Sequence, residues 1–201
     1  MRYEFKALIV SLAHLLTWPI TIPSIIHSRL FRSEGVYDFF SKLISIIPGK
    51  PGQYIRASFY MQTLHKCHYD LVVGFCSFFS HPNAEVGRGV KIGSFSIVGT
   101  AILEDNVIIA SRVSVLSGKY QHGGGPRGRD IKNNSVHYQG VRIGRGSWLG
   151  EGCIVMADIE DGCIVSAGSV VTKTAPVQST AIGNPARFLR YEEIKNEIVH
   201  I

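Results

Sequence analysis

Aliphatic residues recur about every six positions through the second half of the chain. Most are followed by a small or turn-forming residue, as in Val86-Gly87, Ile92-Gly93 and Val98-Gly99. This period predicts short strands that each point one aliphatic side chain inward and then turn, with three strands closing one coil of a parallel β-helix. A β-sandwich would instead alternate apolar and polar residues, with turns roughly every 8 to 12 residues. The period continues at Leu103, Ile109, Val115, Ile143, Leu149, Val155, Ile159, Val165 and Val171.

A long insertion interrupts this period between Val115 and Ile143. Residues 117–140 include the run SGKYQHGGGPRGRD, which carries His122 among glycines and arginines. Because the period resumes after it, we interpret the insertion as a surface loop between two coils. The steps to Leu103 and Ile159 are also shorter than six residues.

Two helices are predicted before the β-helix. VYDFFSKLISII, residues 36–47, places apolar residues at helical spacing and ends at Pro48-Gly49. A second helix, over about residues 53–66, has Ala57, Tyr60 and Leu64 on its apolar side. We therefore predict a helical subdomain at 33–70, the β-helix domain at 71–190, and a C-terminal helix or tail at 191–201.

The N-terminal segment, residues 1–32, is predicted to be a hydrophobic helix that associates with a membrane. No Asp, Glu, Lys or Arg occurs from Ala7 to Ile26, and a straight helix of that length spans roughly 30 Å. Pro19 and Pro23 each remove a backbone donor, which favours a broken, re-entrant or interfacial helix over a full span. The alternative is a helix packed on a partner subunit.

Composition and charge add little to the predicted fold and indicate only which partners to expect. The chain has 201 residues, is 45% hydrophobic and 18% charged, and carries a formal charge of +6, which weakly favours anionic partners. Basic residues are scattered and no recognition motif accompanies them, so we do not expect nucleic-acid binding. The four cysteines form no CxxC pair and indicate small buried or edge side chains in a reducing compartment.

Three runs in the C-terminal half resemble a known family: VRIGRGSWLGEGCIV, IEDGCIVSAGSVVTKTAP and AIGNPARFLR. They are similar to the hexapeptide-repeat acyltransferases, and most similar to the galactoside and xenobiotic O-acetyltransferases within that family. The resemblance covers residues 86–190. It implies a left-handed β-helix, a homotrimer, and acetyl-CoA as co-substrate, bound in the cleft between neighbouring β-helices.

The resemblance also implies a catalytic role for His122. In that family a loop presents a histidine to the acceptor, and the insertion occupies the same place. A hydroxyl is a poor nucleophile at neutral pH, so a neutral imidazole must take its proton as it attacks the thioester. Arg127 and Arg129 are available to meet acidic acceptor groups. The carboxylate that orients His122 is left open among Asp105, Asp130 and Glu151.

Other residues match the family's coenzyme-binding positions. Small residues at Gly150, Ala167 and Gly168 would let the pantetheine arm lie against the coil, although tight turns alone would also explain the glycines. Thr172 and Lys173 match positions near the adenosine phosphate. Arg187 or Arg190 would complete a basic clamp, with Lys173 and Arg190 the stronger candidates. Trp148 is interpreted as a packing residue.

These residues predict an O-acetyltransferase that acts on a sugar hydroxyl of a bacterial surface polysaccharide or its lipid-linked precursor, at the cytoplasmic face of the inner membrane. Ser94 and Ser96 stand where the galactoside enzymes carry an asparagine, which leaves the acceptor open. The alternatives are an N-acetyltransferase for an amino sugar or nucleotide sugar, and a serine acetyltransferase. The N-terminal region does not resemble that of the serine enzymes.

Two hypotheses from other classes fit less well. A zinc hydratase of the γ-type carbonic anhydrase kind needs three imidazoles at one metal, and only His81, His122 and His137 lie within the predicted β-helix, without that group's paired spacing. No metal is therefore expected. A non-catalytic trimerisation scaffold would not need the loop histidine or the basic clamp.

Overall fold

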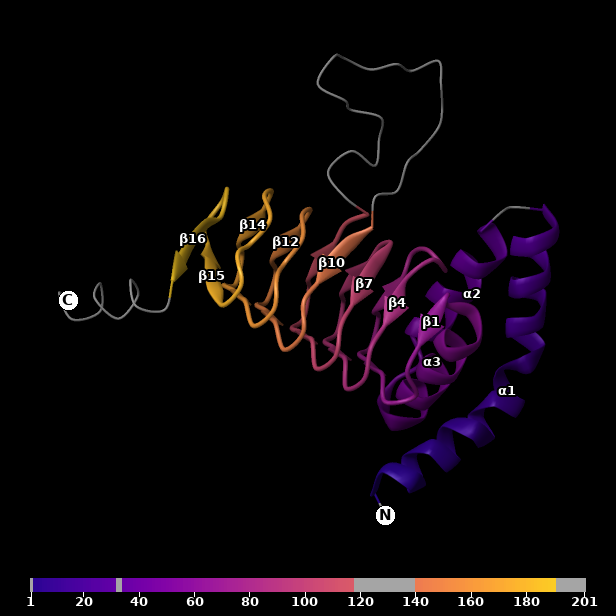
Figure 1. Cartoon of the computed structure of the whole chain (residues 1–201). Coiled ribbons are helices and arrows are strands. Elements are labelled where there is room, and N and C mark those ends of the chain that lie inside the picture. Colours follow the sequence, from indigo (N-terminus) through magenta and orange to yellow (C-terminus); the bar gives the residue numbers. More distant parts are fainter. Residues whose placement is uncertain (1, 32–33, 118–139, 191–201) are drawn as a thin grey trace, which may run out of the picture.

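The computed structural model describes residues 2–31, 34–117 and 140–190, with side chains described from residue 12 to 27 in the first range. Three helices form the N-terminal part: α1 (Arg2–Phe31), α2 (Gly35–Ser45) and α3 (Gly49–Thr63). A β-helix follows, with the helices at one end and the C-terminal strands at the other (Figure 1). The predicted loop, apart from its first and last residues, and the predicted C-terminal helix or tail lie outside the described residues.

Short strands in the described residues form three sheets, one for each side of the triangular coil, and all neighbours pair in parallel except the last two strands of sheet B. Sheet A contains β1 (Lys66–Cys67), β4 (Glu85–Val86), β7 (Ala101–Leu103) and β10 (Val141–Ile143). Sheet B contains β2 (Val72–Val73), β5 (Lys91–Ile92), β8 (Ile108–Ile109), β11 (Trp148–Leu149), β13 (Ile164–Val165), β15 (Ser179–Ile182) and β16 (Arg187–Arg190). Sheet C contains β3 (Phe78–Phe79), β6 (Ile97–Val98), β9 (Ser114–Val115), β12 (Ile154–Val155) and β14 (Val170–Val171).

The predicted six-residue period is confirmed by the core. All twelve of its aliphatic residues are buried, none more than 3% exposed. They stack in columns along the axis of the β-helix, as in sheet B, where Ile109 pairs with Leu149 and Leu149 with Val165. The shortened step to Ile159 keeps its column, because Ile159 bridges to Ile143 in the coil before it. Burial of these side chains, about 1.5 to 3 kcal/mol each, therefore falls in one continuous core.

The β-helix begins at Lys66, earlier than the predicted boundary at residue 71. Its first coil places Cys67, Val73 and Phe79 on the three sides. Phe79 packs edge-on against Tyr60 of α3, with ring centroids 4.9 Å apart, so an aromatic cluster from the helices covers the open end of the stack. The sequence missed only the first strand of this coil, because its inward residue Cys67 is not an aliphatic residue followed by glycine.

Arg56 joins α2 and α3 to the first coil. It is buried, and its guanidinium donates hydrogen bonds to the carbonyl oxygens of Val73 (3.1 Å), Ile44 (3.2 Å), Ser45 (3.2 Å) and Ile47 (2.7 Å). Burial lowers the pKa of Arg56. The carbonyls at the end of α2 compensate the buried charge, since a helix C-terminus carries partial negative charge.

Helix α1 runs through Pro19 and Pro23 without ending, so of the broken, re-entrant or interfacial forms that the prolines favoured, the broken one is wrong. Figure 1 shows that α1 bends part-way along its length. Each proline removes one backbone donor, which is a common cause of such a bend. Within the described residues, no helix combines the length and apolar character required to cross a bilayer.

Candidate functional site

The insertion leaves the β-helix at the corner between sheets C and A. Its first residue, Ser117, follows β9, and its last, Gly140, precedes β10. Both ends are hydrogen-bonded to the backbone of Thr100 in the preceding coil. The Thr100 N–H donates to Ser117 Oγ at 2.8 Å, and the Val141 N–H donates to the Thr100 carbonyl at 3.1 Å. His122 and the loop residues predicted with it, Arg127, Arg129 and Asp130, lie outside the described residues.

Three of the predicted coenzyme residues, Gly150, Ala167 and Gly168, lie on the corner between sheets B and C in successive coils. A Cβ on Gly150 would come within 2.6 Å of the backbone of Ala167 and of Val165, so coil stacking alone requires glycine there. Gly168 has a positive φ of +69° and open space beside it, and Ala167 is exposed. This corner is therefore narrow and free of large side chains at Ala167 and Gly168.

Thr172 and Lys173 follow β14 at the corner between sheets C and A, the corner from which the insertion leaves two coils earlier. After β15, residues 183–186 run beside β14, the last strand of sheet C. The Val170 N–H donates to the Gly183 carbonyl at 2.9 Å, and the Ala186 N–H donates to the Val170 carbonyl at 2.8 Å. The GNPA run is thus held beside β14.

The two predicted clamp arginines lie at opposite ends of β16. Arg187 pairs with Ile182, beside the corner that carries Ala167 and Gly168, whereas Arg190 pairs with Ser179. Three steps along a strand separate their Cα atoms by about 10 Å. Of the two, Arg187 shares the small-residue corner, although the sequence had favoured Arg190.

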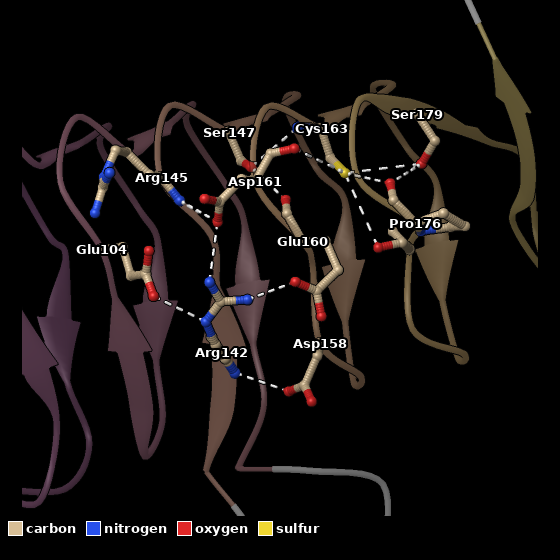
Figure 2. Close-up of polar contacts among 11 residues, drawn as sticks. Glu104, Arg142, Arg145, Ser147, Asp158, Glu160, Asp161, Cys163, Pro176 and Ser179 are labelled. Carbon is tan, nitrogen blue, oxygen red and sulfur yellow. Dashed lines mark hydrogen bonds and ion pairs between the residues drawn. The ribbon is translucent and has the colours of Figure 1, made fainter.

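An ion-pair cluster missed by the sequence analysis surrounds Arg142, two residues after the insertion. Its guanidinium donates to Glu104 Oε1 at 2.8 Å, to Glu160 Oε2 at 2.7 Å and to Asp161 Oδ1 at 2.9 Å, and its backbone N–H donates to Asp158 (Figure 2). Hydrogen bonds to Glu104 and Glu160 raise the pKa of Arg142. The side chain ties together three successive coils at the point where the chain returns from the insertion.

The described carboxylates proposed to orient His122 have other partners. Asp105 accepts a hydrogen bond from the Arg88 N–H at 2.7 Å, and Glu151 pairs with Arg112 at 2.7 Å. Both lie on corners other than the one that carries the insertion. Ser96, noted as a departure from the galactoside enzymes, is buried and donates to the Ala110 carbonyl at 2.9 Å, so it stabilises the coil.

In the part of the chain that the structure describes, no three His, Cys, Asp or Glu side chains are placed to hold a metal ion. His81, one of the histidines considered for a zinc site, pairs with Glu34 through Nδ1 at 2.6 Å. His122 and His137 are outside the described residues.

Comparison with known proteins agrees with the geometry. No protein-family model matches the chain. It is 33% identical over 112 residues to the serine acetyltransferase of Escherichia coli strain K12, which covers 54% of this chain and 37% of that protein. It is 31% identical over 115 residues to serine acetyltransferase 4 of Arabidopsis thaliana, covering 55% of this chain and 29% of that protein.

The fold also has solved counterparts. A maltose O-acetyltransferase from Clostridium difficile 630 superposes with a TM-score of 0.65 and 23% identity, over 77% of this chain and 83% of that one. A hexapeptide-repeat acetyltransferase from Vibrio cholerae gives a TM-score of 0.56 at 16% identity, over 77% and 88% of the two chains.

These comparisons support the hexapeptide-repeat acyltransferase family. This assignment confirms the resemblance noted in the sequence. The match spans only about a third of the length of the serine acetyltransferases, so the likeness does not extend to their acceptor.

Proposed function

We propose that this chain is an acetyl-CoA-dependent O-acetyltransferase that modifies a sugar hydroxyl of a bacterial surface polysaccharide or its lipid-linked precursor. The observation that carries the proposal is the position of the insertion. It leaves the corner between sheets C and A in a member of this family, and Thr172 and Lys173 lie on that same corner two coils further along. A histidine on that insertion and an acyl donor along this edge would serve one reaction.

In the proposed reaction, neutral His122 accepts the proton of the acceptor hydroxyl while the hydroxyl oxygen attacks the thioester carbonyl. The new C–O bond gives a tetrahedral oxyanion, which backbone N–H groups would stabilise. Collapse breaks the C–S bond, and the proton held by His122 passes to the departing thiolate. The products are an acetyl ester and free coenzyme A, with no net change in protons or electrons.

We assign the coenzyme to the face of sheet C, from the B–C corner to the C–A corner that carries Thr172 and Lys173. Gly150, Ala167 and Gly168 would let the pantetheine arm approach the backbone, and the open space beside Gly168 fits that role. Thr172, Lys173 and Arg187 would bind the phosphates, with Arg190 as the more distant candidate. Lys173 and both arginines are exposed, so each is accessible to a ligand.

A sugar acceptor is supported by the likeness to the maltose O-acetyltransferase, which extends over most of both chains. Transfer to serine is a second candidate, since the two relatives described above, 33% and 31% identical, are serine acetyltransferases. Those matches leave close to half of this chain uncovered. For the sugar reaction we propose a homotrimer at the cytoplasmic face of the inner membrane, because the uncharged N-terminal segment suits an acceptor that is itself held in a lipid layer.

The test is to incubate the full chain with isotopically labelled acetyl-CoA and four acceptors: maltose, serine, extracted envelope glycans and lipid-linked glycan precursors. We expect label on a glycan, released by mild alkali because an ester hydrolyses where an amide survives. Label stable to alkali would indicate an N-acetyltransferase, and label on serine alone would favour the second candidate. Failure to bind coenzyme A would contradict both enzymatic proposals and favour a scaffold.

A further inference from the structure

The side of α1 that packs on α3 is small and polar. Thr17 Oγ1 lies 3.0 Å from Ser58 Oγ and accepts a hydrogen bond from Gln62 Nε2 at 2.7 Å. Thr21 Oγ1 donates to Gln62 Oε1 at 3.2 Å. The fully buried positions of the described part of α1 are Ala13, Thr17, Thr21 and Ser24. Hydrogen bonds between side chains therefore join this helix to its neighbour.

The opposite side of α1 is apolar and exposed. Its large side chains are between 46% and 75% exposed, with Leu16 the most exposed. At 100° per residue they cover an arc of about 160° around the helix. The six residues that we name the outer face of α1 are Leu12, Leu15, Leu16, Trp18, Ile22 and Ile26.

This polarity is the reverse of that of a helix on the surface of a water-soluble domain, which buries its apolar stripe and exposes its polar one. It is the arrangement expected beside lipid. There, apolar burial between helices gains nothing over contact with acyl chains, and small or hydroxyl-bearing residues hold helices together. Trp18 on the outer face suits the boundary between acyl chains and headgroups.

The charges around α1 indicate which surface covers the outer face. The sequence has no charged residue from Ala7 to Ile26. Residues 1–33 otherwise contain four basic residues, Arg2, Lys6, Arg29 and Arg32, against one acidic residue, Glu4. Basic residues that flank an apolar helix attract anionic lipid headgroups.

We propose that the outer face of α1 is a membrane-docking surface that inserts into the headgroup and upper acyl region of an anionic bilayer. The inference goes beyond the proposed acetyl transfer and depends on none of its residues. The side chains of the outer face enter the lipid, and the hydrogen-bonded side of α1 that packs on α3 stays out of it.

Trp18 provides a direct probe, because the chain has only two tryptophans. In a full-length Trp148→Phe variant, Trp18 is the sole tryptophan. We would add vesicles of mixed phosphatidylcholine and phosphatidylglycerol whose acyl chains carry bromine. We expect a blue shift of the Trp18 emission and quenching by the bromine.

A second variant tests the outer face itself. Leu15→Glu/Leu16→Glu in the Trp148→Phe background should lower the vesicle partition coefficient at least about tenfold, since charged groups enter lipid at high cost. The matched control is Phe95→Glu/Val177→Glu, which places two glutamates at β-helix positions 58% and 57% exposed. This control should bind vesicles like its parent. Circular dichroism would confirm that all variants keep the fold.

The proposal is overturned if vesicles leave Trp18 unshifted and unquenched, or if both glutamate pairs reduce binding equally. It is also overturned if Trp18 shifts with protein concentration in the absence of lipid and vesicles add nothing, because a second copy would then cover the face. None of these readouts requires acetyl transfer, so failure here is distinct from failure of the proposed function.

Discussion

One buried column shows how individual residues adapt to the stack of coils. The residue before each sheet C strand faces the interior at Ser77, Ser96, Val113, Cys153 and Ser169. The Ser77 and Ser96 hydroxyls donate to the carbonyl oxygens of Gly93 and Ala110, at 2.6 and 2.9 Å. Each acceptor lies at the B–C corner of the next coil. Cys153 takes the same place with a thiol, and burial raises its pKa to about 12. The interior thus holds this thiol in its neutral form.

Stability should consequently fall in alkali. The Cys153 thiol ionises near its ordinary pKa of 9.0 when the chain is unfolded, but only near 12 when it is folded. Above pH 9 the unfolded chain holds fewer protons, so the free energy of unfolding decreases as pH rises towards 12. Between pH 8 and 10.5 this thiol should account for about 2 kcal/mol of that loss. Burial also raises the pKa of Tyr60 to about 12, which acts in the same direction.

Urea unfolding of Cys153→Val at the two pH values checks the assignment. Valine already occupies this column at Val113, so the variant should fold. Its loss of stability between pH 8 and 10.5 should be smaller than that of the unsubstituted protein by about 2 kcal/mol. Equal losses would mean that Cys153 is not protected from ionisation.

Among the elements, the corner of each coil lies close against the backbone of the next coil. Gly74, Gly93 and Gly150 occupy the same corner in different coils, and a Cβ on any of them would come within 2.7 Å of backbone atoms in the following coil. Backbone atoms held by sheet pairing on both sides cannot move aside. Coil spacing therefore disfavours a side chain at these three glycines.

Gly150→Ala should accordingly lower the free energy of unfolding by about 1 to 3 kcal/mol, the range expected for overpacking. Gly140→Ala is the matched control, because its added Cβ would meet only Thr100 at 3.4 Å or more and its φ is not positive. The control should change stability by less than about 0.5 kcal/mol. Equal effects in chemical denaturation would contradict the stacking explanation.

The same elements show what the sequence could predict. Aliphatic residues followed by glycine, such as Val86 and Ile92, reveal the coils because each short strand needs one inward side chain and one tight turn. The strand Lys66–Cys67 escaped prediction because it directly follows α3 and carries no aliphatic-glycine pair. The cover of Phe79 by Tyr60 of a helix also escaped, because it is a contact between distant segments. The polar side of α1 that packs on α3 was also not predicted, since an uncharged segment does not reveal which side its neighbour covers.

In the predicted site too, local motifs could be identified from the sequence, whereas contacts between distant segments could not. Gly150, Ala167 and Gly168 were identified from local motifs, and the structure brings them to one corner. The position of Arg187 beside this corner was not predictable, because it depends on β16 turning back antiparallel to β15. The Arg142 cluster draws its carboxylates from the coils before and after its own, and no short motif records such a contact.

At the scale of the whole molecule, the outer side of sheet B carries an apolar column. Ile108, Trp148 and Ile164 pair in register across three coils and are 42%, 43% and 45% exposed. Exposed apolar columns of this kind mark association surfaces. We propose that this column lies in the interface of the homotrimer expected for this family.

Light scattering in the absence of lipid should then give about three times the 22.1 kDa chain mass. Ile108→Glu/Ile164→Glu should shift the protein to the monomer, because two buried carboxylates would face the partner. Phe39→Glu, at a position on α2 that is 60% exposed, is the control and should keep the trimer. A sheet B variant that remains trimeric would place the interface elsewhere.

The central claim is that this β-helix presents an acyl donor to a histidine on the insertion. It is tested most directly by measuring acetyl transfer and coenzyme A binding side by side for the unsubstituted chain and His122→Ala. Loss of the general base should lower the transfer rate by about 10² to 10⁴ and leave coenzyme A affinity within about twofold, since Ala167, Lys173 and Arg187 are untouched. A His122→Ala variant that transfers acetyl at the original rate would contradict the account.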